Sequence, residues 1–321
     1  MFQRLMTWVP NEGSAWQMAG RMTASKQIGM VGLGLMGTAL AGRLAHAGYG
    51  VVGFDIDAGK QHAWQQLDGA TGVASISDVV RRCDVLFLAV FDTDQVEAVV
   101  EGELLAAAGA GSGKIVLCAS TCDPERIAKL AERVAPEGLT LLDTPISGTS
   151  AQVRQGHGVA FVGGDAARLA EVVPILDAIV PTHFHMGPAG SAGRAKLAIN
   201  LILGLNRLAL AEGLVFAERL GLEPARFLDV ARRAACYSQV MDTKGPKMVR
   251  GDFSPEGRVR QTLKDVELML AQARSLSQDL PLARLNAEIL QACVRNGEGD
   301  RDNSAVINEI RRRVGPASSP P

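Results

Sequence analysis

Residues 28–48, IGMVGLGLMGTALAGRLAHAG, decide the fold of this 321-residue chain. The stretch begins with apolar, uncharged residues, a pattern typical of a strand that is buried on both faces. Gly32, Gly34 and Gly37 follow with the spacing G-x-G-x-x-G. Small and apolar residues then recur at helical spacing as far as Gly48, a residue type that often ends a helix. The order strand, glycine turn, helix is therefore predicted.

This order is the fingerprint of a dinucleotide-binding site. Gly32 would permit the tight turn, Gly34 would let the backbone approach the pyrophosphate, and Gly37 would let helix and strand pack closely. The first turn of the helix would supply N–H donors and a positive dipole end. The residues predicted to bind cofactor here are Gly32, Leu33, Gly34, Leu35, Met36 and Gly37.

A second apolar strand, residues 51–54, ends at Asp55, which lies 18 positions after Gly37 (55 − 37). A carboxylate at this place accepts hydrogen bonds from both ribose hydroxyls and repels a 2′-phosphate. No arginine follows it as far as Lys60, so NAD is favoured over NADP. The alternative, a packing turn beside a solvated aspartate, is disfavoured because the flanking strands and helix are all present.

Composition narrows the class of protein. Hydrophobic residues make up 47% of the chain and the formal net charge is −1, which gives no electrostatic reason to expect nucleic acid or an anionic membrane as a partner. Charged and amide residues interrupt the longest apolar stretch, 195–214, so we expect no membrane span. Residues 1–25 do not resemble a secretory signal.

The chain has five cysteines, an odd number, and no second Cys or His pair completes a zinc site with Cys118 and Cys122. Reduced thiols in a reducing compartment are the expectation, and with them a cytoplasmic protein. The histidines show no metal-ligand spacing, so no metal is predicted.

Apolar strand patterns and helix patterns alternate down to about residue 187, which predicts an α/β fold with a doubly wound, mostly parallel sheet of Rossmann type. Residues 191–220 then contain no proline and keep helical spacing, so we expect one long helix, about 45 Å in length, and a dimer surface on it. The remaining patterns are helical. The predicted organisation is a flexible extension (1–25), a dinucleotide-binding domain (26–188), an all-α substrate and dimerisation domain (189–315) and a flexible tail (316–321).

Four motifs follow one another along the chain: the glycine stretch with Met36, DTPISG at 143–148, GRAKLAIN at 193–200, and Lys264 with Asp265. In this order and spacing they resemble the β-hydroxyacid dehydrogenases. That family includes 3-hydroxyisobutyrate dehydrogenase, L-threonate dehydrogenase and tartronate semialdehyde reductase and, more distantly, 6-phosphogluconate dehydrogenase. The resemblance extends over residues 26–313.

The resemblance implies that Lys196 is the catalytic acid/base and that Asn200 holds both the lysine and the substrate hydroxyl. The two residues are four apart on the long helix and so share one face. A lysine works near neutral pH only if its pKa is lowered by burial or by a nearby cation, and Lys264, matched to a lysine near cofactor and substrate, could supply that cation. The alternative for Lys196 is a solvated lysine on the helix surface.

The family's substrate-carboxylate loop corresponds to Ser147, Gly148 and Thr149, and its third position is usually glycine. Thr149 adopts a positive φ less easily than glycine does. Its side chain would narrow the pocket or add a hydroxyl to it, which leaves the substrate's identity open. Thr121 matches a residue near the nicotinamide and is predicted to contact substrate and cofactor. The remaining predicted contacts along the cofactor groove are Ala89, Val90, Asp94 and Lys264.

The resemblance therefore implies an NAD-dependent oxidoreductase that acts on a short 3-hydroxy acid, assembled as a homo-oligomer through the long helix. Residues 302–306 (DNSAV), together with Asp55 and residues 118–124, look most like the L-threonate dehydrogenase side of the family. Two alternatives stay open: an imine reductase-like enzyme, which commonly carries an acidic or aromatic residue at the position of Lys196, and a catalytically silent NAD-binding protein or reader of nucleosome-like partners.

Overall fold

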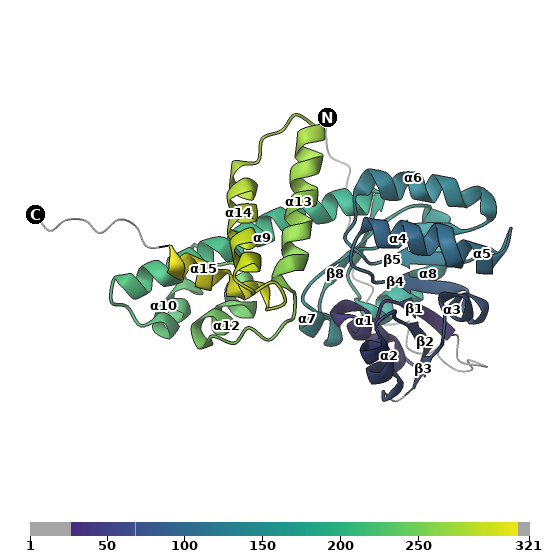
Figure 1. Ribbon diagram of the computed structural model, residues 1–321, viewed down its shortest axis with the longest axis horizontal. Helices are drawn as coiled ribbons and strands as arrows, with labels where there is room; N and C mark the ends of the chain where they lie inside the picture. The colour runs from purple at the N-terminus through teal and green to yellow at the C-terminus, as the bar shows by residue number, and fades with distance from the viewer. Residues whose placement is uncertain (1–26, 68, 314–321) are drawn as a thin grey trace, which may run out of the picture.

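In the computed structural model, which describes residues 27–67 and 69–313, nine strands form one sheet (Figure 1). Their order is β3-β2-β1-β4-β5-β6-β8-β7, and β9 pairs with β8. The strands are β1 (Gln27–Val31), β2 (Gly50–Phe54), β3 (Ala70–Gly72), β4 (Val85–Leu88), β5 (Ile115–Cys118), β6 (Thr140–Asp143), β7 (Ile146–Ser147), β8 (Val159–Gly163) and β9 (His183–Gly187).

Strands β1 to β6 are all parallel, which confirms the predicted α/β class. Strand β8 runs antiparallel to β6 and β7, so the sheet is mixed at this edge. The segment after β6 contains β7 and a short helix, α7 (Ser150–Arg154). The sequence does not predict β7, because a two-residue strand is too short to give a periodic pattern.

Helices cover both faces of the sheet, as expected for a doubly wound fold. One core contains Leu40 and Leu44 of α1 with Val172 of α8, and the other contains Val79 of α3 with Leu130 of α6. The helices of this part are α1 (Leu35–His46), α2 (Ala58–Gln65), α3 (Ile76–Arg82), α4 (Thr93–Val99), α5 (Leu105–Ala108), α6 (Pro124–Val134), α7 and α8 (Ala166–Ile179).

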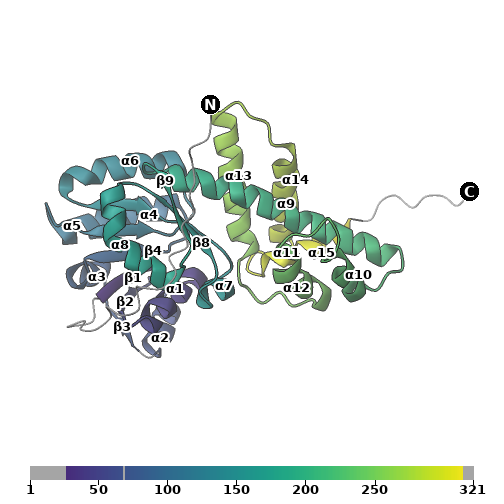
Figure 2. The same cartoon turned by 180° about the vertical axis from the view of Figure 1, so that it is seen from behind.

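Helix α9 (Ser191–Arg219) is 29 residues long and runs from beside the sheet into the helical part of the chain (Figure 2). It packs against several of the helices that follow and forms a separate core with them. We call this helical core the second core and count the two faces of the sheet together as the first. These helices are α10 (Pro224–Ala231), α11 (Val240–Thr243), α12 (Gly245–Arg250), α13 (Val259–Ser275), α14 (Pro281–Arg295) and α15 (Val306–Arg312).

By length and composition, α9 is the one helix among the described residues that could cross a membrane, so the expectation of no span-like segment was wrong on that measure. An 18-residue window of α9 has a mean hydropathy of 1.5, because widely spaced polar residues lower the average only slightly. In this fold its buried residues, Leu208, Ala211 and Leu214 among them, belong to the second core.

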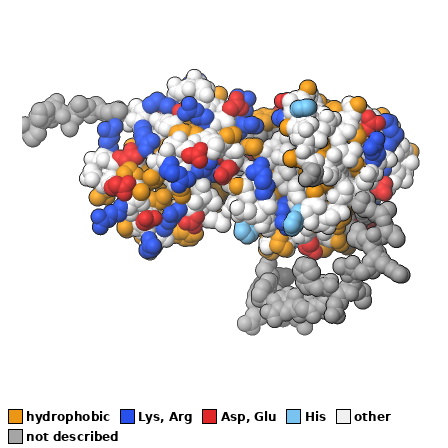
Figure 3. Space-filling model, turned by 90° about the horizontal axis from the view of Figure 1, so that it is seen from below, with side chains coloured by type: hydrophobic (Ala, Val, Ile, Leu, Met, Phe, Trp, Pro, Cys, Tyr) orange, Lys and Arg blue, Asp and Glu red, His pale blue; other side chains and the backbone are white. Residues whose placement is uncertain are grey.

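Figure 3 shows one face of the molecule, on which the charges do not separate into an acidic and a basic side. On the face drawn in Figure 3, acidic and basic side chains are interspersed over both parts of the molecule, with hydrophobic side chains between them. The sheet part ends with β9 at Gly187 and the helical part begins with α9 at Ser191. The predicted N-terminal extension and C-terminal tail lie outside the described residues.

Candidate active site

A cavity of about 870 Å³ is lined by both parts of the chain. It brings together the carboxyl ends of β1, β2, β4 and β5, the loop after β7, and helices α9, α11 and α13. The predicted site residues that line it are Gly32, Gly34, Leu35, Met36, Asp55, Ala89, Val90, Thr121, Ser147, Gly148, Thr149, Lys196 and Asn200. Leu33, Gly37, Asp94 and Lys264 do not line it.

The glycine loop, residues 32–37, combines a strained turn with an open face. Gly32 has φ of 96°, and a Cβ on it would lie 2.5 Å from the carbonyl oxygen of Ala89. A Cβ on Gly37 would lie 1.9 Å from the carbonyl oxygen of Gly32, so strand and helix could not pack this closely with any side chain there. A Cβ on Gly34 would meet nothing within 4 Å. A phosphate can therefore approach the backbone at Gly34 and the start of α1.

Asp55, at the end of β2, braces this loop. Its Oδ2 accepts a 2.7 Å hydrogen bond from the Leu33 amide, and its Oδ1 accepts one from the Asp57 amide. Leu33 itself is buried in the core, so it contributes to the site through its backbone. Lys60 Nζ lies 3.6 Å from Asp55 Oδ2 and its side chain lines the cavity. The preference for NAD was predicted from the lack of an arginine after Asp55, and it did not take account of the lysine at position 60.

The structure does not place Asp94 on the predicted cofactor groove. Asp94 lies in the first turn of α4, where its exposed carboxylate forms a 2.7 Å ion pair with Arg126 of α6. The next residue, Gln95, lines the cavity instead, and its Oε1 accepts a hydrogen bond from the Phe91 amide.

Lys264 supports the cavity wall from behind. Its Nζ donates to the carbonyl oxygen of Thr121, lies 3.1 Å from Asp265 Oδ1 and sits 5.9 Å from the centre of the Phe91 ring. The lysine therefore links α13 to the loop after β5, although it does not line the cavity.

Lys196 is buried on α9, with only 7% of its surface exposed. Its Nζ donates a 2.7 Å hydrogen bond to the carbonyl oxygen of Ile146, the residue before Ser147. Burial lowers the pKa of Lys196 to about 8; Asp265 opposes this shift and Lys264 adds to it. The lysine can thus exchange a proton near neutral pH, and burial matters more than the neighbouring cation.

Asn200, one turn later, turns its amide toward α13. Its Nδ2 donates to Asp265 Oδ2 at 3.1 Å, so the asparagine bonds to Asp265 and not to Lys196. Its Oδ1 is buried and has no hydrogen-bond partner among the residues that the structure describes. Because a buried unpaired acceptor is costly, the free oxygen is poised to accept a hydrogen bond from a ligand.

Asp143 fixes the start of α9, a role that the sequence analysis did not assign. It ends β6, is 3% exposed, and accepts hydrogen bonds from the amides of Gly190 and Gly193 at 3.0 and 2.9 Å. Burial raises the pKa of Asp143 and these backbone donors lower it. A buried carboxylate at a helix N-terminus is favourable, and here it sets the position of Lys196, three residues after Gly193.

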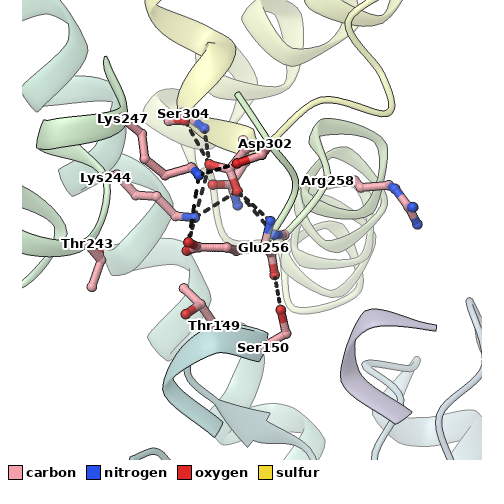
Figure 4. A network of polar contacts seen from close by, with 12 residues as sticks. Thr149, Ser150, Thr243, Lys244, Lys247, Glu256, Arg258, Asp302 and Ser304 are labelled. Atoms are coloured by element: carbon pink, nitrogen blue, oxygen red, sulfur yellow. Dashed lines mark hydrogen bonds and ion pairs between the residues drawn. The ribbon is translucent and has the colours of Figure 1, made fainter. Parts of the chain in front are cut away.

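Thr149 does not adopt positive φ, so the strain expected from replacing glycine is absent. Its φ is −75°, and it caps α7 by accepting a hydrogen bond from the Gln152 amide, while Gln152 bonds back to the Thr149 amide. Figure 4 shows Thr149 and Ser150 on the side of α7 that faces Lys244 and Glu256. The Thr149 hydroxyl proton is still free to donate.

A buried ion network closes the far side of the cavity (Figure 4). Lys244 Nζ lies within 3.0 Å of both oxygens of Asp302 and 3.3 Å from Glu256 Oε2. Asp302, fully buried, also accepts hydrogen bonds from the amides of Glu256 and Ser304. The 302–306 segment thus holds α12 and the chain before α13 together.

Arg207 is the other residue that the sequence analysis overlooked. It interrupts the apolar stretch, yet it is 6% exposed and lines the cavity, one turn beyond Leu203 and two turns beyond Asn200. The signal that could have found it is spacing, because residues 196, 200, 203 and 207 share one helix face.

Comparisons with known proteins agree over nearly the whole described chain. The family model for the NAD binding domain of 6-phosphogluconate dehydrogenase matches residues 27–187, and that for the NAD-binding domain of NADP-dependent 3-hydroxyisobutyrate dehydrogenase matches residues 190–310. L-threonate dehydrogenase from Cupriavidus necator is 32% identical over 88% of this chain and 95% of its own.

Two further proteins are similar. The 2-hydroxy-3-oxopropionate reductase of Escherichia coli is 30% identical over 88% of this chain and 97% of its own. A crystal structure of 3-hydroxyisobutyrate dehydrogenase from Salmonella typhimurium superimposes with a TM-score of 0.81 at 27% identity, covering 88% of this chain and 99% of that one.

Proposed function

This chain belongs to the β-hydroxyacid dehydrogenase family of NAD(P)-dependent oxidoreductases, and from that premise we propose that it interconverts a short 3-hydroxy acid and its semialdehyde or keto acid, with Lys196 as acid/base. The observation that carries the proposal is the position of Lys196. Its amine is buried in the cavity, next to the 147–149 loop, with its pKa lowered to about 8.

In the oxidative direction the neutral amine of Lys196 accepts the substrate's hydroxyl proton as the carbinol carbon gives up its hydrogen with both bonding electrons. A nicotinamide, when bound, accepts that hydride. The hydrogen bond from Lys196 to the Ile146 carbonyl holds the amine in place and leaves its lone pair free for the hydroxyl. In the reductive direction the ammonium returns the proton to the carbonyl oxygen.

The 147–149 loop is the proposed site for the substrate carboxylate. The hydroxyls of Ser147 and Thr149 can both donate there, and Thr149 retains its proton because it serves only as acceptor in the α7 cap. The reacting hydroxyl donates its one proton to Lys196, so the free Oδ1 of Asn200 would accept from another donor of the bound ligand. Together these groups would hold the carbinol carbon in the cavity that Gly34 and Thr121 also line.

We propose NAD as the preferred cofactor, because a carboxylate that directly follows β2, as Asp55 does, would repel a 2′-phosphate. Lys60 weakens that repulsion, since it lies 3.6 Å from Asp55. We also propose self-association through α9, whose Ile202 and Phe216 are 62% and 66% exposed, more than a hydrophobic side chain on a central helix normally is.

The test is a screen of 3-hydroxy acids with NAD and with NADP, followed at the absorbance of the reduced cofactor. Turnover of a 3-hydroxy acid, with a higher kcat/KM for NAD, supports the proposal. Reduction of cyclic imines without oxidation of any hydroxy acid would favour an imine reductase-like enzyme. Cofactor binding without turnover of either class would indicate a catalytically silent protein.

A further inference from the structure

Arg207 lies on the same face of α9 as the proposed acid/base. At 100° per residue, positions 196, 200, 203 and 207 fall within about 60° of one another, so all four side chains meet one wall of the cavity. The helix rises about 16 Å between Lys196 and Arg207. The guanidinium therefore serves the far end of a ligand whose hydroxyl is at Lys196.

Arg207 makes no direct ion pair with any residue that the structure describes. Within the described ranges 27–67 and 69–313 no hydrogen bond or ion pair reaches its guanidinium, and its Nε is buried without a partner. The cations around it are each matched: Lys244 by Asp302 and Glu256, and Lys264 by Asp265. This separates Arg207 from the ion network drawn in Figure 4.

A buried arginine without a direct ion pair destabilises the folded protein. Burial lowers the pKa of Arg207 to about 10, although Asp302 and Asp265 act against that shift, so the side chain stays protonated at neutral pH. An unpaired charge in a low-dielectric site destabilises the folded chain. An apolar residue would pack there at lower cost, whereas a guanidinium offers a forked set of donors that matches a carboxylate or phosphate.

We propose that Arg207 binds a second anionic group of the substrate, a carboxylate or a phosphate, at the end of the cavity away from the 147–149 loop. This inference rests on the proposed function and changes one part of it, the length of the substrate: the preferred substrate becomes a 3-hydroxy acid with a second anionic group far enough along its chain to reach Arg207. The first carboxylate lies at Ser147 and Thr149, the hydroxyl at Lys196, and the chain of the substrate passes Leu203 to reach Arg207.

The variants that test it are Arg207→Met, Arg207→Lys and the control Arg219→Met, which changes an exposed arginine on the same helix. For each, kcat/KM is measured for 3-hydroxy acids of similar length with and without a second carboxylate or phosphate. We expect Arg207→Met to lower the ratio of dianion to monoanion at least about tenfold, Arg207→Lys to lower it less, and Arg219→Met to leave it unchanged.

A ratio that is the same in Arg207→Met as in the unmodified protein overturns the proposal, including the case in which both substrates lose equally because Arg207 holds the first carboxylate. The thermal midpoint of the ligand-free protein is a second readout. Removing an unpaired buried cation should raise the midpoint, whereas a structural arginine would lower it.

Calorimetric titration of decanedioate and of decanoate into the protein with NAD present separates this inference from the proposed function, because a ten-carbon chain is long enough to extend from the 147–149 loop toward Arg207. If no hydroxy acid is oxidised but decanedioate binds more tightly than decanoate only while Arg207 is present, the proposed anion site is supported and the proposed reaction is not. If turnover occurs and Arg207→Met binds decanedioate as the unmodified protein does, the proposed reaction is supported and the anion site is not.

Discussion

At the scale of single residues, the proposed chemistry depends on how the protein destabilises the protonated form of Lys196. Burial is the main cause of its lowered pKa, Lys264 adds a smaller repulsion, and Asp265 acts in the opposite direction. A base must be neutral to accept a proton, so oxidation should speed up as pH rises through about 8. An acid must be protonated, so reduction should slow above the same pH.

Lys264→Met removes the cation that helps to lower the pKa of Lys196. That pKa should therefore rise, the pH profile of kcat/KM for oxidation should move to higher pH, and activity at pH 7 should fall roughly two- to five-fold. Lys264→Arg keeps the charge and should keep the profile. A profile that does not move in Lys264→Met would show that burial alone sets the pKa of Lys196.

The sequence could identify residues that belong to short motifs, but not residues whose position depends on packing between distant segments. The three glycines and Lys196 belong to short motifs whose spacing predicts a turn or a helix face. Arg207 lies outside any motif, and only the packing of α13 and the 302–306 segment around α9 shows that it is buried. The prediction that Asp94 lines the cofactor groove could not take account of Arg126, which lies on a neighbouring helix and forms an ion pair with the Asp94 carboxylate.

At the scale of elements, Asp143 joins the sheet to the long helix. The carboxylate at the end of β6 accepts from two amides at the start of α9, so the strand determines where the helix begins and hence where Lys196 lies. The alternation of strands and helices was predictable because each strand is a continuous apolar run. The β7–α7 segment was not predictable, because its structure depends on the pairing of β7 with β8 and on the Thr149 cap of α7.

Asp143→Ala should leave the amides of Gly190 and Gly193 buried without acceptors. We expect the free energy of unfolding, measured in urea, to fall by about 2–4 kcal/mol and kcat to fall with it, because α9 loses its anchor. Asp165→Ala removes an exposed carboxylate that caps α8 in the same manner and should cost about 1 kcal/mol without changing kcat. Wild-type stability and kcat in Asp143→Ala would contradict the anchoring role.

At the scale of the whole molecule, α9 serves both the active site and the outer surface. One face lines the cavity, another enters the second core, and a third exposes Ile202 and Phe216. The sequence pattern predicted this helix because it contains no proline, yet it could not say which face meets which partner. A helix with one buried face shows a clear 3.6-residue period of apolar residues. In α9 this period is weak, because three of its faces carry apolar residues in different environments.

We predict that Ile202→Glu combined with Phe216→Glu converts an oligomer to the 33.9 kDa monomer in sedimentation velocity. Leu276→Glu, which alters an equally exposed side chain just after α13, serves as the control and should leave the oligomer intact. A wild-type chain that already sediments as a monomer at micromolar concentration would remove the basis for this interface.

The central claim is that Lys196 moves the proton, and the pH dependence of kcat/KM for hydroxy-acid oxidation tests it most directly. The unmodified enzyme should show a rise that levels off above a pKa near 8, whereas Lys196→Ala should lose that rise and about 10²- to 10⁴-fold in kcat, with its affinity for NAD retained. An alanine variant that keeps both the rate and the same inflection would contradict the account.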